Sequence, residues 1–196
     1  MEFRPFGMNP DGTKIRDVSG IIIRSIVDYL EDCVARKEGT GARAVEDLCR
    51  LLNERIRDPA YHVTPDFLKN AWNSYSYEFV SFVREFGIVL SGDPRFNFNA
   101  GKERNVSPLL QILGRPFTLS QIYSMWPYFG QKYARESVIF GVGAVTDRSA
   151  ILKLQFTART HQQFGPYARR CADLVCQSAK GGLAMVPEKV HGLPPA

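Results

Sequence analysis

The sequence predicts an α+β fold that is mainly helical, with one small antiparallel sheet packed on the helices. Apolar residues recur at spacings of three and four over much of residues 19–133 and again after residue 160, as in helices that bury one face. Residues 136–158 instead read as two strands joined by a short polar turn, which predicts a β-hairpin. One hairpin among many helices gives the fold class.

Length and composition predict a single domain. The chain has 196 residues, of which 44% are hydrophobic and 23% charged, and this suits a globular protein with one substantial core. Turn formers gather at Asn9-Pro10 and Asp11-Gly12, so residues 1–17 are expected to form an irregular or extended arm. Residues 18–196 are then expected to be one domain.

Two amphipathic helices are predicted after the arm. The first covers Ile21–Val34, with Ser19 as its N-cap. It carries three successive isoleucines, so one side could remain available to a partner helix. The second covers residues 42–56 and ends before Asp58-Pro59, because a residue that precedes proline avoids the helical conformation.

A strongly aromatic helix is predicted to start at Thr64, whose hydroxyl suits an N-cap, and to run to Leu90. The stretch of residues 95–106, rich in Asn and Gly, is expected to be a loop. A short helix over residues 108–113 should close at Gly114.

A second aromatic helix is predicted from a cap at Thr118 to Tyr133, and Pro127 should kink or divide it. Both aromatic stripes have two interpretations, which are packing in the core and contact with a ligand. Core packing is the commoner role of such stripes, because aromatic side chains contribute so much to burial.

The predicted hairpin pairs residues 136–146 with residues 150–157 through the turn Asp147-Arg148-Ser149. In the first strand, Gly141 and Gly143 leave one face bare, which could admit a close helix or a ligand.

One last helix is expected over His161–Leu183, weakened at its end by Gly181-Gly182. Residues 186–191 are expected to lead into another strand.

Motifs of enzyme chemistry are absent from the sequence. There is no glycine-rich phosphate loop, no His-Glu-x-x-His, no G-x-S-x-G and no Cys-x-x-Cys. His62, His161 and His191 are far apart in the sequence, and we interpret them as surface or capping residues. We therefore expect no enzymatic activity in this chain.

The charge pattern and the apolar pattern limit the possible partners. The net charge is +5, but Lys and Arg are scattered singly among acidic residues, so we expect no nucleic-acid binding. No segment has 18 consecutive apolar residues and no signal-peptide core is present, so we expect no membrane association and a cytoplasmic protein.

Four cysteines lie inside helical patterns, at positions 33, 49, 171 and 176, and are expected to be reduced thiols. Cys171 and Cys176 are five residues apart and so point about 140° apart on a helix, which prevents them from chelating one metal ion as a pair. For each of them a buried, small apolar role is the commoner one.

Three stretches resemble the 4-vinyl reductase family of bacterial sensory domains: Leu113-Gly-Arg-Pro-Phe117, the hairpin, and Cys171 through Ala196. That family is related in fold to vesicle-tethering TRAPP subunits and, more distantly, to haem domains that bind nitric oxide or oxygen. Its members usually precede histidine-kinase, nucleotide-cyclase or AAA+ activator modules. The resemblance implies an N-terminal regulatory domain of a signalling protein.

The resemblance also implies a pocket for a small apolar or aromatic molecule between the central helices and the sheet. The residues that would form this pocket are Trp72, Tyr75, Phe79, Phe82, Tyr123, Trp126, Phe129 and Phe140. No charged residue belongs to this set, so the implied ligand is apolar or weakly polar.

In aromatic-sensing members of the family, one cysteine of the last long helix and residues of a later hairpin hold a structural zinc ion. Cys171 is the better positional match for that cysteine, with Cys176 in reserve. The later hairpin would follow Ala196 and is not in this sequence, so we expect zinc only in a longer protein.

Two alternatives to a ligand sensor remain open. A haem-based gas sensor would need an axial His or Cys and usually a Tyr-x-Ser-x-Arg signature, which is absent, so we do not favour haem. A ligand-free interaction module would use its aromatic residues only as core. For the sensor or the module, the preferred form is a homodimer through the N-terminal helices.

Overall fold

The computed structural model describes residues 3–9, 11–104, 106, 108–146 and 149–196, and the side chains of residues 108–110 are not described. The helices are α1 (Gly20–Glu38), α2 (Ala42–Asn53), α3 (Pro65–Lys69), α4 (Tyr77–Ser91), α5 (Phe96–Arg104), α6 (Pro108–Gly114), α7 (Leu119–Ser124), α8 (Trp126–Tyr133), α9 (Ala158–Phe164), α10 (Tyr167–Ala184) and α11 (Val186–His191), with a 3₁₀ turn at Pro59–Tyr61. The strands are β1 (Val18–Ser19), β2 (Ser74–Tyr75), β3 (Val138–Val145) and β4 (Ala150–Phe156).

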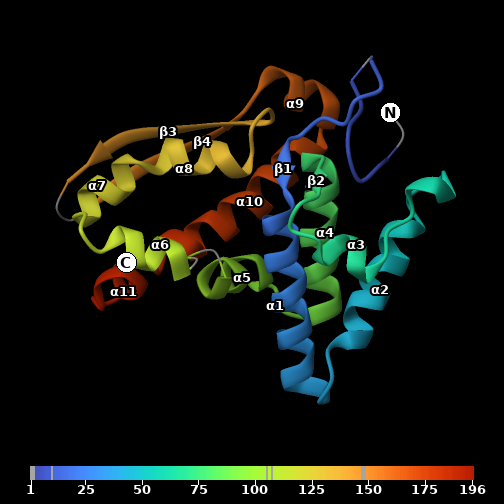
Figure 1. Ribbon diagram of the computed structural model, residues 1–196, viewed down its shortest axis with the longest axis horizontal. Helices are drawn as coiled ribbons and strands as arrows, with labels where there is room; N and C mark the ends of the chain where they lie inside the picture. The colour runs from blue at the N-terminus through green and yellow to red at the C-terminus, as the bar shows by residue number, and fades with distance from the viewer. Residues whose placement is uncertain (1–2, 10, 105, 107, 147–148) are drawn as a thin grey trace.

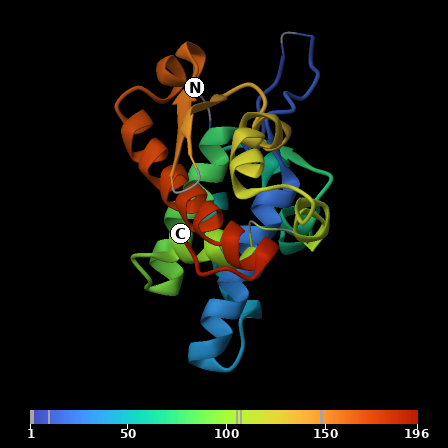
Figure 2. The ribbon, with the colours of Figure 1, turned by 90° about the vertical axis from the view of Figure 1, so that its left-hand side faces the viewer.

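The predicted fold class is confirmed, since the described residues are mainly helical with two small antiparallel sheets. Strands β3 and β4 form the predicted hairpin, and β1 pairs with β2 in a second sheet that the sequence did not predict. Figure 1 shows the hairpin with α7 and α8 on one side of α10, and α1, α2 and α4 on the other, and Figure 2 shows the molecule from the hairpin side. None of the helices in the described ranges combines the length and apolarity needed to cross a membrane.

The predicted helix starts are confirmed by their capping bonds. Ser19 accepts from the backbone N–H of Ile21, and Thr64 accepts from that of Phe67. Thr118 forms a reciprocal capping box with the third residue of α7. The second aromatic stripe divides into α7 and α8 beside Pro127, because proline has no backbone N–H to donate within a continuous helix.

The prediction of one continuous helix from Thr64 to Leu90 was wrong. Helix α3 ends at Lys69, and Asn70 then accepts a hydrogen bond at 3.0 Å from the backbone N–H of Trp72 within a turn. After β2, Ser76 caps a new helix by accepting from the N–H of Phe79 at 3.2 Å. These local side-chain bonds and the β1–β2 pairing compete with the helix that the aromatic spacing favours.

The prediction of a loop over residues 95–106 was also wrong, because α5 fills most of it. The carboxylate of Asp93 accepts from the N–H of Arg95 at 2.8 Å and starts the helix. The ring of Phe96 is fully buried, and a Cβ on Gly87 would lie 2.3 Å from it. This burial outweighs the weak helix propensity of the Asn and Gly residues.

The C-terminal part of the chain contains two further differences from the prediction. The expected single helix is broken at Gly165-Pro166, where Gly165 has φ 51°, into α9 and α10. Residues 186–191 form α11 and do not lead into a strand, because Pro187 suits a first helical turn and Gly192, at φ 66°, ends it.

The backbones of α5 and α10 lie in direct contact. A Cβ on Gly101 would lie 2.1 Å from the carbonyl oxygen of Ser178, and one on Gly181 would lie 2.0 Å from that of Phe98. Only glycine permits such an approach. Gly181 therefore fixes the position of α10 and does not merely weaken its end.

Asp17, at the end of the N-terminal arm, ties the arm to the hairpin. Its Oδ1 accepts from the N–H groups of Glu136 and Ser137, both at 3.2 Å, and its Oδ2 accepts from the hydroxyl of Ser137. Burial of the carboxylate raises its pKa despite these bonds.

Two residues of the predicted hairpin turn, Asp147 and Arg148, lie outside the described residues.

The apolar side chains form two separate clusters. The main core gathers α1, α2 and α4, and its fully buried residues include Leu30, Leu48 and Phe79. The small core joins α7 to α11 and consists of Val106, Ile122, Met185, Val186 and Val190, with Leu119 and Tyr123 packed against it. The candidate site lies between these two cores.

Candidate ligand-binding site

A cavity of about 510 Å³ lies between the main core and the small core. Its walls come from β1, α1, α4, α5, α6, α7, α8, the hairpin, α10 and α11. Val80 and Val175 of the main core line it, as do Ile122 and Val186 of the small core. Most of the surrounding surface is apolar, which is typical of sites for small organic molecules.

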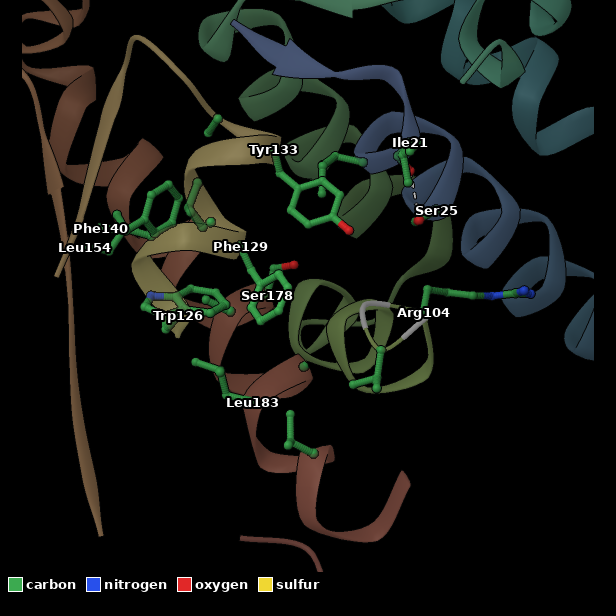
Figure 3. Close-up of a pocket in the computed structure, with 18 of the residues that line it drawn as sticks. Ile21, Ser25, Arg104, Trp126, Phe129, Tyr133, Phe140, Leu154, Ser178 and Leu183 are labelled. Atoms are coloured by element: carbon green, nitrogen blue, oxygen red, sulfur yellow. Dashed lines mark hydrogen bonds between the residues drawn. The ribbon is translucent and has the colours of Figure 1, made fainter. Parts of the chain in front are cut away.

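Aromatic residues of α8 form one wall. Figure 3 shows Trp126, Phe129 and Tyr133 projecting from this helix toward the interior. The ring of Trp126 meets Phe140 of the hairpin edge-on, with centroids 5.5 Å apart at 83°. The Phe140 ring fits against α8 because Gly130 has no side chain, and a Cβ there would lie 2.6 Å from the ring.

Helices α1 and α10 form two further walls. Ile21, Ile22 and Ser25 line the cavity from α1, and the Ser25 hydroxyl donates to the Ile21 carbonyl at 2.8 Å. On α10 the small residues Ala179 and Gly182 leave room for the cavity. The glycine contact between α5 and α10 brings this wall close to α5.

Helix α4 contributes Tyr77, Val80 and Arg84, which share one face at spacings of three and four. Arg84 brings a charged group to the wall, although its side chain is only 6% exposed. A second arginine, Arg104, also lines the cavity, but Figure 3 shows its side chain extending away from it, and its guanidinium pairs with Asp32.

Four of the eight sequence-predicted ligand residues come together at the cavity, namely Tyr123, Trp126, Phe129 and Phe140. All four belong to the second aromatic stripe or to the hairpin. Tyr123 also donates from its hydroxyl to the carbonyl of Leu183 at 3.0 Å, which joins α7 to the end of α10.

The other four predicted ligand residues lie elsewhere. Trp72 is in the turn before β2 and is 95% exposed. Tyr75 and Phe79 are fully buried in the main core, where their rings stack at 5.5 Å. Phe82 is half-buried against Tyr167, at 5.3 Å between ring centroids. Phe79 and Phe82 lie on the side of α4 away from Arg84 and pack with the main core.

The sequence prediction missed the contributions of α1, α10 and Arg84. An arginine on the same helical face as Tyr77 and Val80 was a readable signal, since the three positions repeat at helical spacing. The α10 wall could not be read in this way, because it depends on the small residues that the α5 contact brings into place.

The cysteines do not fit a zinc site. Cys171 is fully buried, and its thiol shares a hydrogen bond with the hydroxyl of Ser81 on α4. Burial raises the pKa of Cys171 to about 12, which disfavours the thiolate that binds zinc. Cys176 is half-buried, and among the described residues no three His, Cys, Asp or Glu side chains are placed to hold a metal ion.

The cavity also does not fit haem. The described residues that line it include neither histidine nor cysteine, the usual axial ligands. His62 instead makes a ring-nitrogen hydrogen bond with the carbonyl of Ile56 at 3.1 Å, and His161 packs edge-on against Phe156.

Comparison of the chain with family models, curated proteins and solved structures gives no match. The functional proposal below is therefore based on the cavity and on the chemistry of its lining residues.

Proposed function

We propose that this chain is a regulatory sensor domain of a bacterial signalling protein, such as a cyclase, histidine kinase or activator. It binds a small apolar or aromatic molecule and has no enzymatic activity of its own. The observation that carries the proposal is the cavity of about 510 Å³ between the two cores, lined mostly by apolar and aromatic side chains. This volume falls in the usual range of ligand sites, about 300–1,000 Å³.

Ligand binding would act on the whole domain because both cores line the cavity. A bound molecule would contact Val80 of the main core and Ile122 of the small core together. It would therefore favour the arrangement in which the two cores face each other at this spacing. Such a shift in population is the signal that an attached output module would receive.

The test uses N-phenyl-1-naphthylamine, a neutral aromatic probe that fluoresces in apolar sites. We expect it to bind and to raise the melting temperature. In Ala179→Phe, a ring placed on the cavity wall should weaken binding by roughly tenfold or more, about 1.4 kcal/mol. The matched control is Lys180→Phe, which adds the same ring to the exposed side of α10 and should bind normally.

Two results would contradict the proposal. One is the absence of both fluorescence and a thermal shift in the wild-type protein at probe concentrations up to its solubility limit. The other is equal loss of binding in the two phenylalanine variants, which would mean that the probe does not enter the cavity.

A homodimer through the N-terminal helices is a separate part of the proposal. The apolar side of α1 is largely used within the chain, where Ile23 and Leu30 are fully buried, and Ile21 is 49% exposed. The rest of the outer face is polar, with Arg24 and Asp28 paired at 3.6 Å. A dimer would have to combine Ile21 with this polar surface, and light scattering that gives a monomer mass at high micromolar concentration would exclude it.

The cytoplasmic location is also proposed. All four cysteines are free in the structure and three of them are buried, as suits thiols in a reducing compartment.

A ligand-free interaction module is the second candidate. The observation in its favour is the outer face of the hairpin, where Ile139 is 54% and Ile151 is 58% exposed. Failure of every apolar probe to bind, together with normal folding, would favour this module over the sensor.

A further inference from the structure

Arg84 is a buried cation that has no counter-ion among the described residues. Its side chain is on α4, the residue is 6% exposed, and its Nε and Nη1 atoms have no hydrogen-bond partner. Among the described residues no carboxylate forms an ion pair with it. Burying a charge costs several kcal/mol unless it is paired and hydrogen-bonded, so this arrangement is unfavourable in the absence of a partner.

The titratable groups that act on Arg84 do not supply the missing negative charge. They are the hydroxyl of Tyr77 and the thiol of Cys171. Burial raises the pKa of both groups, that of Cys171 to about 12, so both are neutral near pH 7. The nearby carboxylate of Glu85 is occupied by the guanidinium of Arg170 at 3.1 Å and the hydroxyl of Tyr167 at 2.9 Å.

Arg84 also lies on the wall of the cavity. It shares a helical face with Tyr77 and Val80, which line the same space. Arg104 does not duplicate it, because the Arg104 guanidinium is neutralised by Asp32. Among the described lining residues, Arg84 therefore brings a guanidinium without a paired carboxylate to walls that are otherwise mostly apolar.

A purely structural role would give Arg84 a different set of contacts. A buried structural arginine is held by carbonyl or carboxylate oxygens, because its donors must be satisfied. At Arg84 two of the three nitrogens lack such oxygens. A guanidinium stays protonated in proteins and suits a carboxylate through two parallel hydrogen bonds.

We propose that the ligand of this cavity is an organic carboxylic acid with an apolar or aromatic body, and that its carboxylate pairs with Arg84. This inference rests on the proposed function and specifies the ligand class. The sequence implied an apolar or weakly polar ligand, and the inference adds a charged end to that apolar body. The carboxylate satisfies the guanidinium, while the body of the ligand lies against Trp126 and Phe129.

The test compares 4-phenylbutanoic acid with its isosteric neutral amide, 4-phenylbutanamide, by competition against N-phenyl-1-naphthylamine. A hydrogen bond to a charged group contributes about 1.5–3 kcal/mol, so the acid should bind roughly 10- to 100-fold more tightly than the amide at pH 7. In Arg84→Met the preference should disappear while the neutral probe still binds. Arg84→Lys should retain part of the preference. Sodium acetate alone should not displace the probe.

The outcomes separate this inference from the proposed function. If the neutral probe binds but the acid and the amide compete equally in the wild-type protein, the carboxylate assignment is wrong and the sensor proposal stands. If the preference persists in Arg84→Met, the carboxylate binds elsewhere and Arg84 is not its partner. If neither the probe nor either competitor binds, both proposals fail. If Arg84→Met does not fold, the wild-type comparison still decides the ligand class, and an undiminished preference for the acid in Arg84→Lys would show that Arg84 is not its partner.

Discussion

At the scale of single residues, Arg84 combines a buried charge with unsatisfied hydrogen-bond donors. Its guanidinium is buried, its Nε and Nη1 atoms have no partner among the described residues, and desolvation lowers its pKa. Residues of this kind are commonly kept for function at the expense of stability. The two roles can be separated, because removal of the charge should affect stability and ligand preference in opposite directions.

We predict that Arg84→Met stabilises the ligand-free protein. Methionine keeps most of the side-chain volume and removes the unpaired charge, so the free energy of unfolding should rise by roughly 1–3 kcal/mol. Urea denaturation without ligand measures the change, with Arg43→Met on the exposed side of α2 as the control that should stay within about 0.5 kcal/mol. A clear loss of stability in Arg84→Met would show that the guanidinium has a structural partner.

At the scale of elements, the close approach of α5 to α10 positions one wall of the cavity. Gly101 and Gly181 let the two backbones touch, and α10 then presents Ala179 and Gly182 to the cavity. The contact depends on the absence of side chains at these two positions.

We predict that Gly181→Ala destabilises the protein and weakens probe binding together. The new methyl group would lie 2.0 Å from the carbonyl oxygen of Phe98, so α10 must shift, at a cost of about 1–3 kcal/mol. The neighbouring Lys180→Ala, on the exposed side of α10, should change neither property. Thermal melts and probe titrations measure both, and a Gly181→Ala protein of unchanged stability would contradict the close packing.

The same scale shows how far the sequence could predict the fold. Ser19, Thr64 and Thr118 were predicted as caps because capping acts within a few residues of the chain. Helix α5 was missed because its formation depends on the burial of Phe96, whose ring packs against that of Tyr29 on α1, far away in the sequence. Tertiary burial of this kind overrides local propensity, and a single sequence gives no view of it.

The sequence likewise predicted those parts of the candidate site that belong to one local pattern. Trp126 and Phe129 share a helix, so periodicity could group them, and the hairpin pattern added Phe140. The prediction that Trp72 lines the pocket with them was wrong, because the helix that was expected to carry Trp72 ends at Lys69. The contribution of α1 came from the packing of distant segments, which periodicity does not report.

At the scale of the whole molecule, two hydrophobic cores meet around one cavity. The main core gathers buried apolar residues of α1, α2 and α4 with others from the hairpin and α10, while the small core joins α7 to α11. A ligand that binds the folded protein and not the unfolded chain stabilises it by mass action. Because the cavity lies between the cores, this stabilisation should reach both.

The central claim is that the ligand binds in this cavity, and the two tryptophans of the chain give separate signals that test it. Trp126 lines the cavity, whereas Trp72 is not among its lining residues and is 95% exposed in the turn before β2. Their indole N–H signals in a ¹H–¹⁵N NMR spectrum can be assigned with the variant Trp72→Phe. We predict that 4-phenylbutanoic acid shifts the Trp126 signal in a saturable manner and leaves the Trp72 signal in place. A titration that shifts Trp72, or that shifts neither signal while the acid binds, would contradict the placement of the ligand in this cavity.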